Sequence, residues 1–204
     1  MSVTALWFGQ AGLRLFGGEV DFLTDTLRVM LCTSSYTPDQ DDHLYLSAAD
    51  WASGAYVLED RVRPTTRNGH LYECTVAGTS DVSEPVWPTV DGDTVVDGTV
   101  TWTCIANGDI SYYEVTDTGY TAEGEALASK TLSYSTLVTT FDAADVTWAS
   151  SSITARYAVL YQDSGTESTS ILLAYVDFGE DKVSSSGDFK VIWHANGILT
   201  VTAE

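Results

Sequence analysis

The sequence predicts an all-β or mostly β protein, built as a β-sandwich or an open barrel that carries a small inserted β module. Thr, Ser, Val and Tyr are plentiful and Lys is rare, a composition that favours extended backbone. Short apolar runs alternate with clusters of Gly, Asp, Asn and Ser, as in strands separated by turns. Only two stretches favour a helix, which leaves little room for any other fold class.

Those two stretches are residues 5–16 and 47–51. In the first, apolar residues recur at several helix-compatible spacings, although Gly9 and Gly12 weaken a helix there. In the second, Ser47 can cap a single turn, with Asp50 three residues further on. We therefore expect a short N-terminal helix beside an otherwise extended chain.

Strands are expected where polar and apolar residues alternate, or where a short apolar run lies between turn residues. These segments are 20–23, 27–32, 131–140, 154–161, 171–178, 189–193 and 198–202. The segment 171–178 is almost wholly apolar, which predicts a central strand covered on both faces. The pair Asn196-Gly197 lies between two alternating runs and predicts a hairpin that joins them.

Residues 51–108 differ in composition from the sequence on either side. They hold three of the four prolines, three of the six tryptophans and two of the three cysteines. Insertions are tolerated at loops where the two ends of the inserted segment emerge close together. The sequence therefore predicts a discontinuous β base, residues 1–50 and 109–204, with an inserted β module at 51–108.

The inserted segment also carries a set of short motifs. They are Ala-Tyr-Val at 55–57, Val-Arg-Pro at 62–64, Asn-Gly-His-Leu-Tyr-Glu-Cys at 68–74, Gly-Thr-Ser at 78–80, Glu-Pro-Val-Trp-Pro at 84–88 and Asp-Gly-Thr-Val-Thr-Trp at 97–102. Taken together, they resemble a small module that recurs in structural proteins of tailed bacteriophages. The likeness covers about a quarter of the chain.

Motifs in the flanking sequence carry a second resemblance. They are Asp-Thr-Leu-Arg-Val-Met-Leu at 25–31, Ser-Tyr-Thr-Pro-Asp at 35–39, Glu-Val at 114–115, Gly-Tyr at 119–120, Trp148, Ile-Thr-Ala-Arg at 153–156, Ala-Val-Leu-Tyr at 158–161, Trp193 and Gly-Ile-Leu at 197–199. This part is similar to a family of phage virion proteins found among head and tail components. The resemblance implies particle assembly, and it brings no catalytic residue and no cofactor.

The function that this resemblance favours is that of a capsid decoration or cement protein. Such a protein binds the outside of an assembled head, as a symmetric oligomer, and stabilises it by burying surface against the major capsid protein or other virion proteins. A tail- or fibre-associated component is the first alternative, and a host-glycan-binding module is the second. The expected location is the virion, assembled in the host cytoplasm.

Two sets of residues are candidates for contacts. The first is the N-terminal apolar set, which serves either a subunit or capsid contact or the protein's own core: Leu6, Trp7, Phe8, Leu13 and Phe16. The second is Trp87 with Tyr56, whose rings suit ligand stacking if they are exposed. A small module also needs large side chains for its core, so aromatic residues there serve packing as well.

The charge balance narrows the classes of partner. Nine Lys and Arg face 29 Asp and Glu, a formal net charge of -20. Contacts with nucleic-acid phosphates and anionic membranes need Lys and Arg, so neither partner is expected. The N-terminus lacks a basic region followed by an apolar run, and no apolar stretch approaches the ~20 residues of a membrane span.

Catalytic and metal-binding patterns are weak. No His-x-x-x-His or Cys-x-x-Cys spacing, nucleophile elbow or phosphate loop occurs, and His43, His70 and His194 lie far apart. We therefore expect no enzyme activity, no metal and no cofactor. The acidic runs 39–42 and 91–98 suit calcium in ligand type, but they lack the EF-hand order and are better explained as turns.

Three cysteines argue against a disulfide framework. Cys32 lies in an apolar run and is expected to be a buried thiol. Cys74 and Cys104 lie in two expected strands that could be neighbours, so a disulfide between them stays open on geometry. A reducing cytoplasm favours free thiols.

Overall fold

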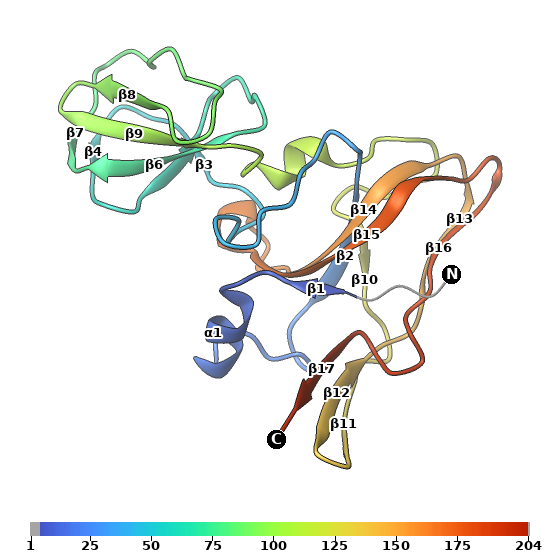
Figure 1. The fold of residues 1–204 in the computed structure, drawn as a ribbon. Helices are drawn as coiled ribbons and strands as arrows, with labels where there is room; N and C mark the ends of the chain where they lie inside the picture. Colours follow the sequence, from blue (N-terminus) through green and yellow to red (C-terminus); the bar gives the residue numbers. More distant parts are fainter. Residues whose placement is uncertain (1–4, 204) are drawn as a thin grey trace.

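The computed structural model of the protein describes residues 5–203 and confirms a mostly β fold (Figure 1). Within this range the strands form five sheets, none of which closes into a barrel. Helical structure is confined to α1 (Ala11–Phe16) and two single-turn 3-10 helices, η1 (Ile110–Tyr113) and η2 (Glu167–Thr169).

The main sheet of the base has five antiparallel strands in the order β1-β15-β14-β2-β10. Their bounds are β1 (Leu6–Trp7), β2 (Leu27–Cys32), β10 (Glu125–Ala126), β14 (Thr154–Gln162) and β15 (Ile171–Val183). The expectation that 171–178 forms an internal strand agrees with this order, because β15 lies between β1 and β14.

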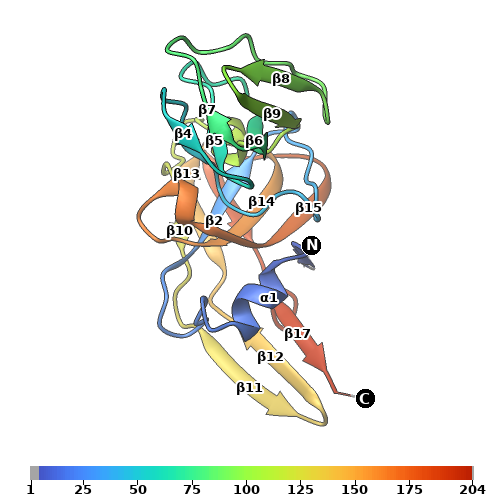
Figure 2. The same cartoon turned by 90° about the vertical axis from the view of Figure 1, so that its left-hand side faces the viewer.

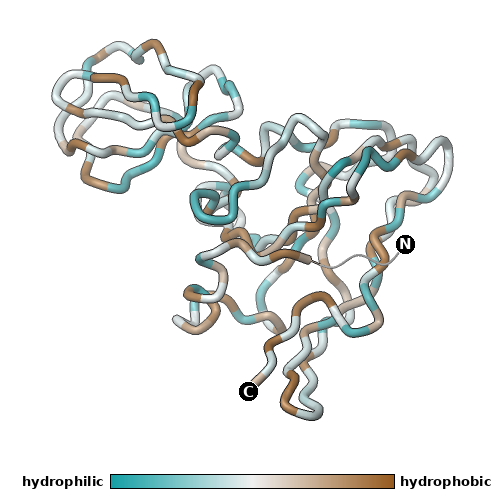
Figure 3. Tube along the Cα trace, in the orientation of Figure 1, coloured by the Kyte–Doolittle hydropathy of each residue, from teal (hydrophilic) through white to brown (hydrophobic). Residues whose placement is uncertain are grey.

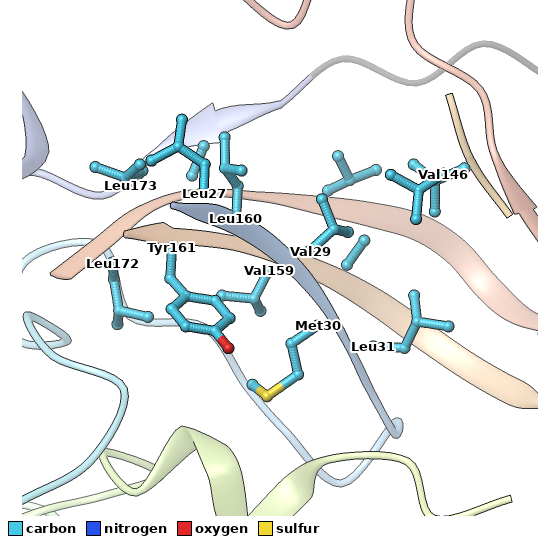
Figure 4. Close-up of a cluster of buried hydrophobic side chains, with 14 of the residues drawn as sticks. Leu27, Val29, Met30, Leu31, Val146, Val159, Leu160, Tyr161, Leu172 and Leu173 are labelled. Atoms are coloured by element: carbon cyan, nitrogen blue, oxygen red, sulfur yellow. The ribbon is translucent and has the colours of Figure 1, made fainter. Parts of the chain in front are cut away.

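Both faces of this sheet are buried in its middle. Figure 4 shows Val29 and Leu160 on one face, and Met30 and Tyr161 on the other, with the two faces filled by large apolar side chains. All four residues are at most 3% exposed. Continuous apolar runs such as 29–32 are therefore required here, since an alternating pattern would bury polar groups on one face.

Two smaller sheets extend the base. One contains β11 (Thr131–Ser135), β12 (Val138–Asp142) and β17 (Leu199–Thr202), and the other pairs β13 (Val146–Ser151) with β16 (Gly187–Val191). Figures 1 and 2 show the β11–β12 hairpin projecting from the end of the base that lies furthest from the module. All of these sheets contribute to one apolar core, which draws on residues 8–46 and 110–199.

The module, residues 51–108, stands beside the base at the other end of the molecule (Figures 1 and 2). Its main sheet has the order β3-β5-β6-β9-β8, and β4 pairs with β7. The bounds are β3 (Ala49–Asp50), β4 (Ala55–Tyr56), β5 (Arg61–Arg63), β6 (Leu71–Val76), β7 (Gly78–Thr79), β8 (Thr94–Asp97) and β9 (Val100–Ile105). A second apolar core, separate from that of the base, contains residues from 51 to 104.

Two local expectations were wrong, and a third was confirmed only in part. Residues 47–51 form the short strand β3 instead of a helical turn, because the Ser47 hydroxyl donates to Asp109 and does not cap a helix. Residues 20–23 form a turn, in which Asp21 Oδ1 accepts the backbone N–H groups of Leu23 and Thr24. The expected helix over 5–16 begins only at Ala11, after the strand β1.

The expected hairpin at Asn196-Gly197 was also wrong. The turn exists, since Gly197 has a φ of 93° and its N–H donates to the carbonyl of His194. However, the strand before it pairs with β13, and the strand after it pairs with β12. The alternating runs on the two sides of the turn bury their apolar residues against different sheets, so the chain changes sheet here.

Candidate interaction surfaces

The structure divides the N-terminal candidate residues between core and surface. Phe8 is 1% exposed and packs against Tyr175, with 5.4 Å between ring centroids, so it closes the protein's own core. Trp7 is half-buried beside Phe22. Leu6, Leu13 and Phe16 are exposed, and Phe16 reaches 83%.

The helix α1 is anchored along one side only. Ala11 is buried and Leu15 packs against the core of the base. The Arg14 guanidinium donates to Glu19 at 2.6 Å and lies over the ring of Tyr45, 5.7 Å from its centroid. A helix of six residues is not stable alone, so these contacts hold it in place. Leu13 and Phe16 gain nothing from this packing, which leaves them available to another molecule.

The aromatic candidates in the module lie at the boundary of its core. Trp87 is half-buried, with its ring 4.2 Å from that of Tyr72 and its Nε1 donating to Glu84 at 2.8 Å. Tyr56 is also half-buried and meets Trp102 edge-on at 4.7 Å. Both rings therefore contribute to packing.

A shallow groove of about 340 Å³ runs beside Trp87. It is lined by Pro64, Thr66, Asn68, Glu84, Pro85 and Val86. Stacking on a sugar needs a free ring face, and Tyr72 already occupies one face of Trp87. A ligand in the groove could therefore stack on at most one face of Trp87.

A buried carboxylate organises the core of the module. Asp97 is 2% exposed, and its Oδ2 accepts the indole N–H groups of Trp51 at 2.9 Å and Trp102 at 3.1 Å. Its Oδ1 accepts the backbone N–H of Asp81 at 2.8 Å. Sequence reasoning placed Asp97 in an acidic turn, because nothing local shows that two distant tryptophans converge on it.

Three arginines of the module join it to the base. Arg67 binds the fully buried Asp109 through two hydrogen bonds, Nε to Oδ2 at 2.7 Å and Nη2 to Oδ1 at 2.5 Å. Arg63 pairs with Glu167, and Arg61 donates to the carbonyl of Asp42 at 2.9 Å. Bidentate arginine pairs fix geometry as well as charge, so these contacts set the orientation of the module.

His43 adds a neutral contact at the same junction. It is 3% exposed, and its Nδ1 lies 3.0 Å from the Tyr36 hydroxyl and 3.2 Å from the backbone nitrogen of Asp39. Its Nε2 lies 3.1 Å from the carbonyl of Ala106 in the module. A backbone N–H can only donate, so Nδ1 accepts and Nε2 carries the proton. Burial lowers the pKa of His43, which keeps the ring neutral.

The histidines and acids considered for chemistry lie apart. In residues 5–203, no group of three or more His, Cys, Asp or Glu side chains is arranged to hold a metal ion. Asp39 Oδ1 accepts the backbone N–H groups of Asp41 and Asp42, and Asp91 Oδ1 accepts that of Ala106. These carboxylates are thus engaged in turns, through the bonds that Asp typically makes to nearby backbone.

All three cysteines are free and buried. Cys74 and Cys104 do lie on the paired strands β6 and β9, but they are not opposite each other, because Cys74 faces Trp102 and Cys104 faces Tyr72. Diagonal neighbours in a sheet lie roughly 7–8 Å apart, outside the usual span of a disulfide. Burial raises the pKa of Cys104 to about 11, so this thiol is unreactive.

Sequence reasoning missed one exposed apolar surface, on the sheet β11-β12-β17. Paired residues place Leu132, Tyr134, Phe141, Leu199 and Val201 on one face. Phe141 and Leu199 are buried, whereas Leu132, Tyr134 and Val201 are 48–68% exposed. Figure 3 shows a hydrophobic stretch near the tip of this hairpin, beyond paler residues. The apolar face thus extends past the end of the core.

Comparisons with protein-family models, curated proteins and solved structures found no match for this chain. Among the described residues, no helix has both the length and the apolar character needed to cross a bilayer. The function must therefore be argued from the surfaces and contacts of the protein itself.

Proposed function

We propose that this protein is a structural component of a tailed-phage particle, and specifically a capsid decoration protein that docks on the head through α1. The observation that carries the proposal is the exposure of Leu13 and Phe16, 69% and 83%, on a helix anchored along its other side. Neighbouring exposed apolar side chains of this size suit a contact with another protein.

The architecture supports the same role. The base and the module have separate cores, and partly buried ion pairs join one to the other. A rigid body with a docking helix on the base can cover a boundary between shell subunits while the module extends away from it. Binding that requires the assembled shell stabilises that shell by mass action.

The proposal is tested by locating and removing the contact. In purified particles that contain this chain, we expect a copy number comparable to that of the major capsid protein. We expect the double variant Leu13→Asp/Phe16→Asp to fold but to lose particle binding. A matched control is Val183→Asp, which changes an exposed apolar residue, 68% exposed, at the end of β15.

Other results would assign the protein elsewhere. A copy number comparable to that of tail fibres would place the protein in the tail instead of on the head. Retention of particle binding by Leu13→Asp/Phe16→Asp would contradict docking through α1. Binding to host glycans that disappears in Trp87→Ala would favour the groove beside Trp87, and turnover of a substrate by the purified chain would overturn the structural role.

A further inference from the structure

The strand β11 forms a free edge of the sheet β11-β12-β17. It pairs with β12 on one side, and all five of its residues are exposed. Among residues 5–203, no side chain or loop donates to or accepts from the backbone of 131–135 on the other side. An uncovered edge strand is a template for pairing with another strand.

The backbone groups at this edge can be assigned from the ladder. The carbonyl of Leu137, just before β12, accepts the N–H of Ala203, and the carbonyl of Phe141 in β12 accepts the N–H of Ile198. Backbone groups alternate sides along a strand, so Val138, Thr140 and Asp142 bond to β11. Their partners there are Ser135, Ser133 and Thr131. Leu132 and Tyr134 are therefore the residues whose N–H and C=O groups point outward.

The same two residues carry the exposed apolar face of the strand. Leu132 is 48% exposed and Tyr134 is 68% exposed. The outward hydrogen-bonding groups and the uncovered apolar side chains thus belong to the same positions. Pairing of this edge with a second strand would satisfy both at once.

The distribution of charge favours a second copy of this chain as the partner of the β11 edge. The chain has a net charge of -20, so two copies repel over most of their surface. Residues 126–141 contain no Asp or Glu and include Lys130, and residues 191–203 of the neighbouring segment contain no charged residue. Two copies can therefore approach at this sheet without bringing carboxylates together.

Two other sheet edges, β10 and β8, lack this combination. The edge strand β10 has only two residues, one of which is Glu125. The edge strand β8 follows Asp93 and ends at Asp97. Short edges and charges within the strand discourage strand pairing; β11 has five residues and none of them is charged, although Lys130 directly precedes it.

We propose that β11 pairs antiparallel with β11 of a second copy, about a twofold axis at Ser133. In this register Leu132 lies opposite Tyr134 of the second copy, and each exchanges backbone hydrogen bonds with the other. The strand complements itself, as a twofold contact requires. The result is one continuous six-stranded sheet, formed by the three strands of each copy. This pairing needs no capsid and does not depend on the proposed function.

The test uses the purified full-length chain in sedimentation equilibrium. We expect a reversible dimer at micromolar to submillimolar concentration. Tyr134→Glu places a carboxylate at each end of the shared edge, so we expect the dissociation constant to rise by roughly tenfold or more. The matched control Val96→Glu, an exposed valine of β8 in the module, should leave it unchanged.

A cross-link tests the register without weakening the contact. Cα atoms of a directly opposed, non-hydrogen-bonded pair lie about 4.5 Å apart, within the span of a disulfide. Since the three native cysteines are buried, Ser133→Cys introduces the reactive thiol. With oxidised glutathione we expect a covalent dimer from Ser133→Cys and none from Ser185→Cys, an exposed serine outside this sheet.

A chain that remains monomeric, without cross-linking at Ser133→Cys, would overturn the proposal. So would a dimer that Tyr134→Glu leaves intact. If the chain is monomeric and Tyr134→Glu abolishes its binding to particles, the β11 edge instead contacts another protein of the particle. Circular dichroism of each variant confirms that the sheet has folded before its association is compared.

Discussion

At the scale of single residues, Asp97 has the clearest structural role. One carboxylate accepts N–H groups from two tryptophans on different segments of the module and from the backbone of Asp81. Since unsatisfied buried donors are costly, this residue links the strands of a core that has few apolar residues.

We predict that Asp97→Asn destabilises the protein by about 1–3 kcal/mol. An asparagine side chain has one acceptor oxygen, and its amide group would face at least one N–H donor. Denaturant unfolding followed by tryptophan fluorescence measures the change. Asp93→Asn is the control, because Asp93 is exposed; an effect of Asp97→Asn below ~0.5 kcal/mol, as for a surface substitution, would contradict this role.

His43 predicts a pH dependence of stability. Its pKa in the folded protein is lowered by burial, despite nearby Asp39 and Asp42, so the unfolded chain takes up a proton first as the pH falls. Stability is therefore fully present above the ordinary histidine pKa of about 6.5 and declines below it. The pKa of His70 is lowered too, and it acts in the same direction.

Comparison of the native protein with His43→Gln isolates this contribution. Between neutral pH and roughly pH 5.5, we expect the melting temperature of the native protein to fall more steeply than that of the variant. The raised pKa of half-buried Glu114, caused mainly by desolvation, acts with the opposite sign, since its contribution is lost as the pH rises. This contribution of Glu114 is common to both proteins. If the melting temperatures of the native protein and His43→Gln fall equally with pH, the role of His43 is contradicted.

At the scale of elements, the β11–β12 hairpin is turned by residues that do not favour its geometry. Thr136 and Leu137 have φ values of 50° and 67°, and together they form the two-residue loop between Ser135 and Val138. Asn-Gly is the usual sequence for such turns. The hairpin therefore stores strain at its tip, where Leu137 is 53% exposed.

We predict that Thr136→Asn/Leu137→Gly stabilises the protein by about 1–2 kcal/mol, because the left-handed region costs ordinary residues that much. Thermal unfolding measures the gain. The control Thr131→Asn makes a similar exchange at an exposed position of β11 whose φ is not positive, and it should give no gain. If the double variant is less stable than the native protein, Leu137 contributes packing that outweighs the strain.

At the scale of the whole molecule, charge is the dominant unfavourable feature. Eight of the nine Lys and Arg side chains form ion pairs: Arg14, Arg28, Arg61, Arg63, Arg67, Arg156, Lys182 and Lys190. Because acids outnumber bases by 20, most carboxylates have no cation beside them. Their mutual repulsion opposes the compact state.

We predict that the melting temperature rises by a few degrees as NaCl increases from low to physiological concentration. Salt weakens the long-range repulsion between carboxylates. It also weakens the exposed ion pairs, but each of these contributes little to stability. Equal osmolality of an uncharged solute serves as the control. A melting temperature that is flat or falls with salt would show that the ion pairs matter more than the net repulsion.

The sequence by itself determined the fold class and many of the strands. Apolar runs such as 29–32 and 171–176 can be buried on both faces inside a sheet, so the hydrophobic effect favours their place there. Charge composition likewise follows from counting residues. The composition of 51–108 predicted an inserted module, and buried residues between 51 and 104 form an apolar cluster of their own.

The tertiary structure decided which distant residues meet. Phe8 is buried while Leu13 and Phe16 are exposed, although all three belong to one apolar stretch. The pairing of β11 with β12, and not with a second neighbour, left an apolar edge that alternation alone could not reveal. Burial depends on what packs over a side chain, and that partner lies far away in the sequence, so local pattern cannot supply it.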